Sequence, residues 1–127
     1  LVPPVDGDLA LAYGLLPESD TKIRFKGNLF RAKEGSPVRA VFSGTVAFTG
    51  WLEGYGRTVI LDHGDNYFSV YANATSLEVR SGSSVKEGSV LGYTTDFETV
   101  FGQGLYFELR HYSEPENPKY WLKGRET

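Results

Sequence analysis

Residues 57–72 read RTVILDHGDNYFSVYA, and this stretch decides the fold class. Two runs rich in β-branched and aromatic residues, Arg57–Asp62 and Tyr67–Ala72, stand on either side of a short His-Gly-Asp-Asn segment. Such runs are typical of strands, and Gly, Asp and Asn between them are typical of a hairpin turn. The stretch therefore predicts two antiparallel strands joined by a tight connection.

Segments of the same kind continue outward from this hairpin along the chain. Apolar or aromatic runs separated by clusters of Gly, Asn, Asp or Ser predict further strands. They lie at Val38–Phe42, Thr45–Gly50, Glu78–Val79, Val90–Thr94 and Leu105–His111, with an edge strand or short element at Asp8–Tyr13. No window sustains the 3.6-residue period of an amphipathic helix, so we expect no long helix.

Two turn-and-strand segments resemble one another and refine this prediction. Glu34–Ala40 (EGSPVRA) and Ser81–Gly88 (SGSSVKEG) each place a Gly-containing turn before a Val and a basic residue. Each continues into an apolar stretch that reaches a further Gly, at Gly44 and Gly92. Together with the strand spacing, the two units favour an all-β fold of the barrel-sandwich hybrid type over an immunoglobulin sandwich.

Length and composition exclude several classes of protein. The 127 residues fit one domain, and 40% hydrophobic with 23% charged residues exclude a disordered tail. A net charge of −3 gives no basic footprint for nucleic acid. The absence of Cys excludes disulfides and thiolate metal sites, and no run approaches the ~18 apolar residues of a membrane span. The chain also lacks Met, even at position 1, which favours a piece of a longer protein.

Motifs for metal, nucleophilic or phosphate chemistry are weak. A catalytic zinc takes three protein ligands, but His63 and His111 stand far apart and outside any paired-histidine motif. A turn role for His63 and a solvated or packing role for His111 are favoured over metal ligation. No Gly-x-Ser-x-Gly elbow occurs, and Gly54-Tyr-Gly56 and Gly102-Gln-Gly104 lack the third glycine of a phosphate loop.

The strand predicted near the C-terminus has one polar face. Alternation along Leu105–Arg110 places Tyr106, Glu108 and Arg110 on the same side. Tyr and Arg are the residue types that dominate binding energy at protein interfaces. The residues by themselves leave two interpretations open: a protein interface, or an ordinary aromatic-rich β core with an exposed ion pair.

A series of short motifs occurs in a fixed order along the chain. They are Lys26-Gly27, Glu34–Val46 (EGSPVRAVFSGTV), Gly54-Tyr55-Gly56, Val59–Gly64 (VILDHG), Tyr71-Ala72, Gly82–Gly92 (GSSVKEGSVLG), Leu105–Arg110 (LYFELR) and Asn117–Leu122 (NPKYWL). In this order they resemble the LytM (lysostaphin-like) peptidase domain, from about residue 25 to residue 122. The resemblance implies the hybrid β fold of that family, with short irregular terminal segments. It places the domain at residues 21–122, with an N-terminal extension or start of the domain at 1–20 and a tail at 123–127.

Active LytM domains are zinc endopeptidases that cut peptidoglycan cross-links, and the resemblance implies that this chain has lost their site. Their zinc ligands come from an H-x3-D segment and from the second His of H-x-H. The first His of H-x-H and a His after a Tyr-Ala pair assist catalysis. Position by position, this chain has Phe25 and Leu29, then Asn73, then Gly104 and Tyr106. We therefore expect no zinc, no cofactor and no hydrolase activity.

Degenerate LytM domains regulate cell-wall amidases in Gram-negative bacteria, and this chain most resembles the EnvC type, with the NlpD type next. The resemblance implies a periplasmic, non-catalytic activator of N-acetylmuramoyl-L-alanine amidases at the division septum. It also implies an upstream region that engages the FtsE–FtsX complex. Two alternatives stay open: a peptidoglycan-binding module that does not cut, and a zinc endopeptidase with a displaced site.

The partner is expected to bind the groove in which active members hold their metal. The expected residues are Phe25, Lys26, Leu29, Tyr55, Asn73, Tyr106 and Arg110. Phe25 and Leu29 would offer apolar surface, while Tyr and basic residues of the set would offer aromatic area and charge. The competing interpretation is that these side chains only fill the vacated space.

Overall fold

The computed structural model describes residues 1–11, 14–15, 24–25, 27–100, 102–111 and 114–116, and these ranges contain strands and no helix. The strands of the large sheet are β1 (Asp8–Leu11), β4 (Asn28–Arg31), β6 (Gly44–Leu52), β7 (Gly56–Gly64), β8 (Tyr67–Ala72), β10 (Ser84–Val85), β14 (Leu105–His111) and β15 (Glu114–Glu116). Their order is β1-β4-β14-β8-β7-β6-β10, with β15 paired to β14, and every pairing is antiparallel. The prediction of an all-β fold is confirmed.

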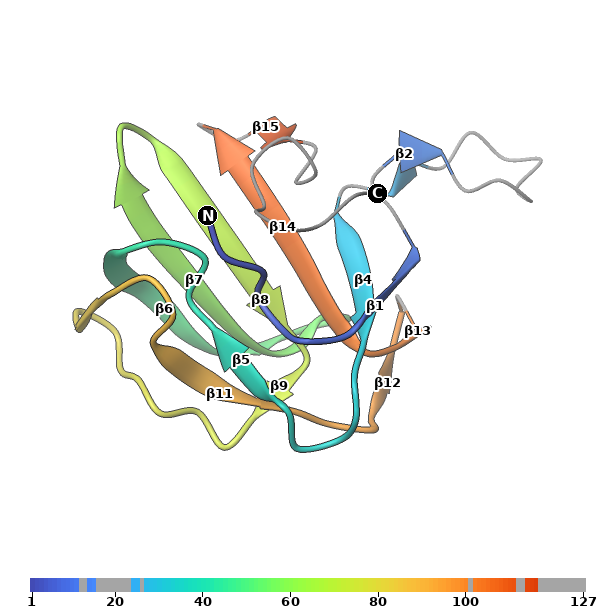
Figure 1. Cartoon of the computed structure of the whole chain (residues 1–127). Helices are drawn as coiled ribbons and strands as arrows, with labels where there is room; N and C mark the ends of the chain where they lie inside the picture. Colours follow the sequence, from blue (N-terminus) through green and yellow to red (C-terminus); the bar gives the residue numbers. More distant parts are fainter. Residues whose placement is uncertain (12–13, 16–23, 26, 101, 112–113, 117–127) are drawn as a thin grey trace.

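Smaller sheets complete the fold. One contains β5 (Pro37–Arg39), β11 (Val90–Thr94) and β9 (Ala74–Thr75); the others are the pairs β12 (Glu98–Thr99) with β13 (Gly102–Gln103), and β2 (Gly14–Leu15) with β3 (Arg24–Phe25). In Figure 1 the β5-β11-β9 sheet lies across one face of the large sheet. Side chains from both sheets form one buried core, which gives the hybrid of barrel and sandwich.

Three aromatic rings contact one another in the core. Phe107, from the centre of β14, meets the ring of Phe30 at 6.5 Å and that of Tyr71 at 5.4 Å, both edge to face. Leu105 and Leu109 lie on the same side of β14 and belong to the same cluster. Because side chains alternate along a strand, the residues between them point to the opposite face of the sheet.

The central hairpin forms as expected. Gly64 pairs with Tyr67, so β7 and β8 are joined by the two residues Asp65 and Asn66. Both have positive φ, 52° and 65°, which is the signature of the type I′ turn that matches strand twist. The tight connection predicted from the sequence is confirmed.

Two of the shorter predicted strands differ from the structure. The strand expected at Val38–Phe42 ends at Arg39, because Val41 donates its N–H to the Tyr71 hydroxyl at 3.0 Å instead of joining a ladder. Glu78–Val79 is not a strand, although the Glu78 N–H reaches the Leu91 carbonyl at 2.9 Å. In both places a backbone N–H group donates its hydrogen bond to a partner far away in the sequence. The local sequence pattern does not reveal such partners.

The first residues of the chain pack on the sheets. Val5 is buried in the core, Val2 donates its N–H to the Val41 carbonyl, and Arg39 donates its own to the Pro4 carbonyl. β1 then adds an edge strand beside β4, where one was expected. The Asn117–Leu122 motif and the tail at 123–127 lie outside the described residues. No helix in the described part of the chain is long and apolar enough to cross a membrane.

Candidate functional site

Leu29 and Tyr106, two of the positions matched to the zinc ligands, lie side by side on the face of the large sheet opposite the core. β14 pairs with β4 on one side and β8 on the other, which places Tyr106 between Leu29 and Ala72. These three side chains form a small buried cluster of their own, against which Tyr55 packs. We call this surface the Tyr106 face and include in it Glu108 and Arg110, which follow Tyr106 on the same side of β14.

A hydrogen-bonded chain runs along this side of β14. The Tyr106 hydroxyl donates to Glu108 Oε2 at 2.5 Å, and Arg110 Nε donates to Glu108 Oε1 at 2.7 Å. Glu108 is only 1% exposed, whereas the Arg110 side chain is 28% exposed. One of the two interpretations left open by the sequence was an exposed ion pair on this face, but the structure places a buried carboxylate there, with both oxygens bound inside the protein.

The tyrosines of this face stay protonated. Burial raises the pKa of Tyr106, and the hydrogen bond to Glu108 raises it further because that carboxylate stabilises the neutral hydroxyl. Burial also raises the pKa of Tyr55, whose ring meets that of Tyr106 edge to face at 5.9 Å. The phenolate that a metal ion would need is therefore disfavoured at this position.

Asn73 occupies the position matched to a catalytic histidine and acts as a structural link. Its Nδ2 donates to the carbonyls of Phe97 at 2.9 Å and Gly104 at 3.1 Å, and its N–H donates to the Arg57 carbonyl. It is buried and has a φ of 70°, a conformation that Asn tolerates better than most residues. One side chain thus joins the turn before β12 to the turn before β14.

Replacing Asn73 by Gly is expected to lower the free energy of unfolding by about 2 kcal/mol, because two carbonyls lose their donor. Because Gly tolerates the positive φ, the measured loss of stability reports the contribution of the Asn73 side chain alone. Ser76→Gly is the matched control, since Ser76 is exposed and also has a positive φ of 50°. Urea unfolding of both variants provides the measurement, and an equal change in the two would contradict the structural link.

An open cleft adjoins the Tyr106 face beside Asn73. Its volume is about 480 Å³, and it is lined by Trp51, Gly54, Gly56, Asn73, Phe97, Glu98, Thr99 and Val100. Three of these residues are unusually exposed for their type: Trp51 by 66%, Phe97 by 68% and Val100 by 77%. The sequence analysis did not select Phe97 and Val100 as site residues. They could have been selected as isolated apolar residues within the polar, turn-rich stretch before β14.

The structure brings most of the expected groove residues together but buries several of them. Leu29, Tyr55, Asn73, Tyr106 and Arg110 lie on or beside the Tyr106 face. Leu29 and Tyr106 are each 1% exposed, so the expectation that they offer open surface is wrong: they fill the space themselves. Phe25 belongs to β3, whose backbone pairs with β2, and Lys26 lies outside the described residues. Membership of this set in a partner-binding groove stays a prediction.

Comparison with known families turns the motif resemblance into an assignment. The model for peptidase family M23 matches residues 24–118. The chain belongs to peptidase family M23. This M23 domain is 34% identical over 119 residues to the murein hydrolase activator EnvC of Escherichia coli (strain K12), covering 94% of this chain and 28% of EnvC.

Two further proteins extend the comparison. The M23 domain is 36% identical over 103 residues to a lipoprotein NlpD/LppB homolog of Pseudomonas aeruginosa, covering 79% of this chain and 34% of that protein. Among solved structures, Helicobacter pylori Csd3 superimposes with a TM-score of 0.83 at 26% identity, covering 100% of this chain and 36% of that one. The chain spans about a third or less of the length of these relatives.

The zinc ion that the M23 family implies does not fit the side chains at the matched positions. Zinc takes imidazole, thiolate or carboxylate ligands. Leu29 has no donor atom, the Tyr106 hydroxyl donates to Glu108, and the Asn73 amide donates to two carbonyls. Within the ranges that the structure describes, no group of three or more His, Cys, Asp or Glu could hold a metal ion.

A displaced zinc site at His63 does not fit either. His63 Nδ1 donates to the Ser43 carbonyl at 2.8 Å, and Nε2 shares a hydrogen bond with Ser69 Oγ at 2.6 Å, so both ring nitrogens are used. His63 was expected to bond local backbone, but β6–β7 pairing brings Ser43 beside it instead. The other histidine, His111, stacks on Tyr67 with ring centroids 4.0 Å apart, as the packing interpretation proposed.

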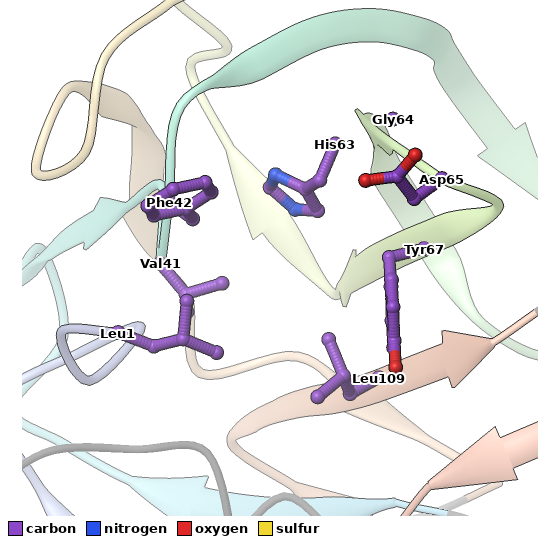
Figure 2. A pocket seen from close by; sticks show the side chains of 8 residues that line it. All are labelled: Leu1, Val41, Phe42, His63, Gly64, Asp65, Tyr67 and Leu109. Carbon is purple, nitrogen blue, oxygen red and sulfur yellow. The ribbon is translucent and has the colours of Figure 1, made fainter.

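Figure 2 shows the surroundings of His63, a cavity of about 260 Å³ lined by Leu1, Val41, Phe42, His63, Gly64, Asp65, Tyr67 and Leu109. Leu109 in its lining points to the core side of β14, whereas Tyr106, Glu108 and Arg110 point to the opposite face of the sheet. The His63 cavity is therefore separate from the candidate site.

His63 is expected to make folding sensitive to acid. Burial lowers its pKa, outweighing the bond to Ser43 and the charge of Asp62, which both favour the protonated ring. In the unfolded chain the pKa is about 6.5, so the unfolded state binds more protons just below that pH. Stability contributed by neutral His63 is full above about pH 6.5 and falls as the pH drops towards the folded pKa.

Urea unfolding at about pH 7.5 and about pH 5.5 checks this expectation on the wild-type chain and on His63→Gln. The wild type should lose more stability between the two values than the variant, which cannot titrate at this position. Equal losses would show that the His63 ring is not the acid-sensitive group.

Proposed function

We propose that this chain is a non-catalytic activator of N-acetylmuramoyl-L-alanine amidases, working in the periplasm of a Gram-negative bacterium at the division site. The observation that carries the proposal is how this chain uses the positions matched to the catalytic site of active family members. Leu29, Asn73 and Tyr106 are buried and used for packing or internal hydrogen bonds, so the M23 fold is kept without the M23 donors. Similarity to a murein hydrolase activator over 94% of the chain supports the same conclusion.

The proposed interface is the Tyr106 face with its adjoining cleft. Tyr55 and Arg110 are the partly exposed members of the expected set, and buried Leu29, Asn73 and Tyr106 shape the floor beneath them. The exposed side chains of the cleft, Trp51, Phe97 and Val100, extend the apolar surface available to a partner. Aromatic and Arg side chains at the centre of an interface supply most of its binding energy.

The remaining members of the expected set and the wider assembly are also proposed. Phe25 and Lys26 complete the interface, and residues 21–122 form the activating domain. A region upstream of this chain would engage the FtsE–FtsX complex, since the chain spans only 28% of the length of EnvC. No cofactor takes part in this function.

A dye-release assay on purified peptidoglycan tests the function. The chain alone should release no dye, and it should increase release by a purified periplasmic amidase. Release by the chain alone that a chelator abolishes, or an amidase rate that the chain leaves unchanged, would refute the proposal.

Tyr55→Ala and Trp51→Ala test the interface. Truncating an anchor at the centre of an interface costs at least ~2 kcal/mol, so amidase affinity should fall roughly thirtyfold. Phe42→Ala is the control, because Phe42 is an exposed aromatic residue beside the distant His63 cavity. If both interface variants bind and activate like wild type, the partner binds elsewhere.

A second function rests on the cleft alone. Exposed Trp51 and Phe97 beside polar Thr99 form the mixed aromatic and polar surface that a peptidoglycan-binding module needs. Co-sedimentation of the chain with purified peptidoglycan in the absence of amidase separates this function from activation. Binding that Trp51→Ala abolishes, without any effect on an amidase, would favour the binding module.

A further inference from the structure

The buried carboxylate of Glu108 is not explained by catalysis, because the M23 donors around it are absent. Moving an isolated carboxylate from water into a protein interior costs several kcal/mol unless it is paired and hydrogen-bonded. Among the residues that the structure describes, Glu108 meets this condition through two neighbours on its own strand, the Tyr106 hydroxyl and Arg110 Nε. Both of its oxygens are thereby committed.

The three side chains differ in their access to solvent. Glu108 and Tyr106 are each 1% exposed, whereas the Arg110 side chain is 28% exposed. Glu108 therefore has almost no surface with which to contact another molecule. Any effect of Glu108 on a partner is therefore indirect, and Arg110 is the more exposed of the two side chains that Glu108 holds.

Holding that guanidinium has a consequence for binding. An unrestrained Arg side chain has many rotamers, and ordering such a side chain at an interface weakens binding by up to about tenfold. The 2.7 Å bond from Nε to a buried, immobile carboxylate restricts the guanidinium before any partner arrives. A planar guanidinium fixed in orientation is suited to a carboxylate group, which it can bind through parallel hydrogen bonds.

We propose that Glu108 is a positioning residue, which orients Arg110 to receive a carboxylate side chain of the protein partner. This inference rests on the proposed function, since it concerns the same face and the same partner. It adds the chemistry of one contact and assigns a role to a residue outside the expected interface set. Tyr106 takes part by holding the second oxygen of Glu108.

A double-mutant cycle with a purified amidase tests the inference. Glu108→Gln should weaken amidase binding by about tenfold in the wild-type background, the cost of ordering one side chain. In an Arg110→Gln background, Glu108→Gln should change affinity by less than about twofold, because the group through which it acts is gone. Glu78→Gln is the matched control and should leave affinity unchanged, because Glu78 is exposed and lies outside both the Tyr106 face and its adjoining cleft.

A second measurement uses the chain alone. The Arg110 Nε–H resonance should exchange slowly with solvent in the wild type and quickly in Glu108→Gln, at a pH where both are shown to be folded. Additive effects of the two substitutions on affinity, or an Nε–H signal unaffected by Glu108→Gln, would overturn the positioning role. A wild-type chain that binds no amidase would instead refute the proposed function, so the two failures are distinguishable.

Discussion

Replacing Gly104 by Ala is expected to lower the free energy of unfolding by about 3 kcal/mol or more. A Cβ atom at this position would stand 2.4 Å from the Phe30 carbonyl oxygen, closer than such atoms approach in proteins. That carbonyl belongs to β4, whose pairing with β14 begins at the next residue, Leu105. The backbone φ of Gly104, 124°, is also one that L-residues rarely adopt.

Gly82→Ala separates the cost of the close Cβ contact from the conformational cost of the positive φ. Gly82 has a φ of 90°, but a Cβ there would meet no atom within 4 Å. It should therefore show only the conformational cost, about 1 kcal/mol. Urea unfolding of both variants measures the difference. Similar losses at the two positions would mean that contact with the Phe30 carbonyl contributes little.

The expected result at Gly104 bears on the proposal that this chain is not a peptidase. Gly104 is matched to the first His of the M23 H-x-H motif, and a His side chain begins with the same Cβ atom. Restoring that His would therefore force β14 away from β4. We expect side-chain replacement alone to be insufficient to rebuild a zinc peptidase here, because the backbone has adapted to the missing side chain.

Arg110→Glu is expected to lower the free energy of unfolding by about 3–5 kcal/mol, the usual cost of leaving a buried charge without its partner. Arg110 Nε supplies one of the two hydrogen bonds to buried Glu108, and the variant would place a second carboxylate beside it. Arg57→Glu is the control with the same charge change, since Arg57 is exposed on β7. Its effect should stay within about 0.5 kcal/mol.

Thermal and urea unfolding of the two charge reversals check this expectation. Equal stability of Arg110→Glu and wild type would mean that Glu108 is satisfied without Arg110. The result also determines how the interface should be tested. A loss of amidase activation in Arg110→Glu would combine damage to the fold with damage to the contact, so Arg110→Gln is the more informative substitution for binding.

Much of the fold could be predicted from local pattern. The hairpin at Asp65 and Asn66 is specified by residues that tolerate positive φ, flanked by β-branched and aromatic runs. β14 was expected with its bounds, Leu105–His111, because its alternation is long and regular. Glu78–Val79 was the exception, since a single backbone hydrogen bond to Leu91 does not make a strand.

The candidate site was only partly predictable. Alternation along β14 placed Tyr106, Glu108 and Arg110 on one face, and the structure keeps them there. The same reasoning could not decide between an interface and an exposed ion pair, and did not foresee that Glu108 is buried, because period-2 patterning tells which residues share a face but not what covers that face. Phe97 and Val100 were missed for a related reason: the cleft is made by segments far apart in sequence, β6–β7 and the β12–β13 hairpin.

The sequence by itself thus determined the strand pattern, the family and the loss of the metal donors. Each of these depends only on which residues occur and on their spacing along the chain. Only the tertiary structure decided how the vacated positions are used. Asn73 links two turns that lie 24 and 31 residues away, and Glu108 is buried by packing on the Tyr106 face. Burial and long-range hydrogen bonds depend on which segments meet in space, and local pattern does not carry that information.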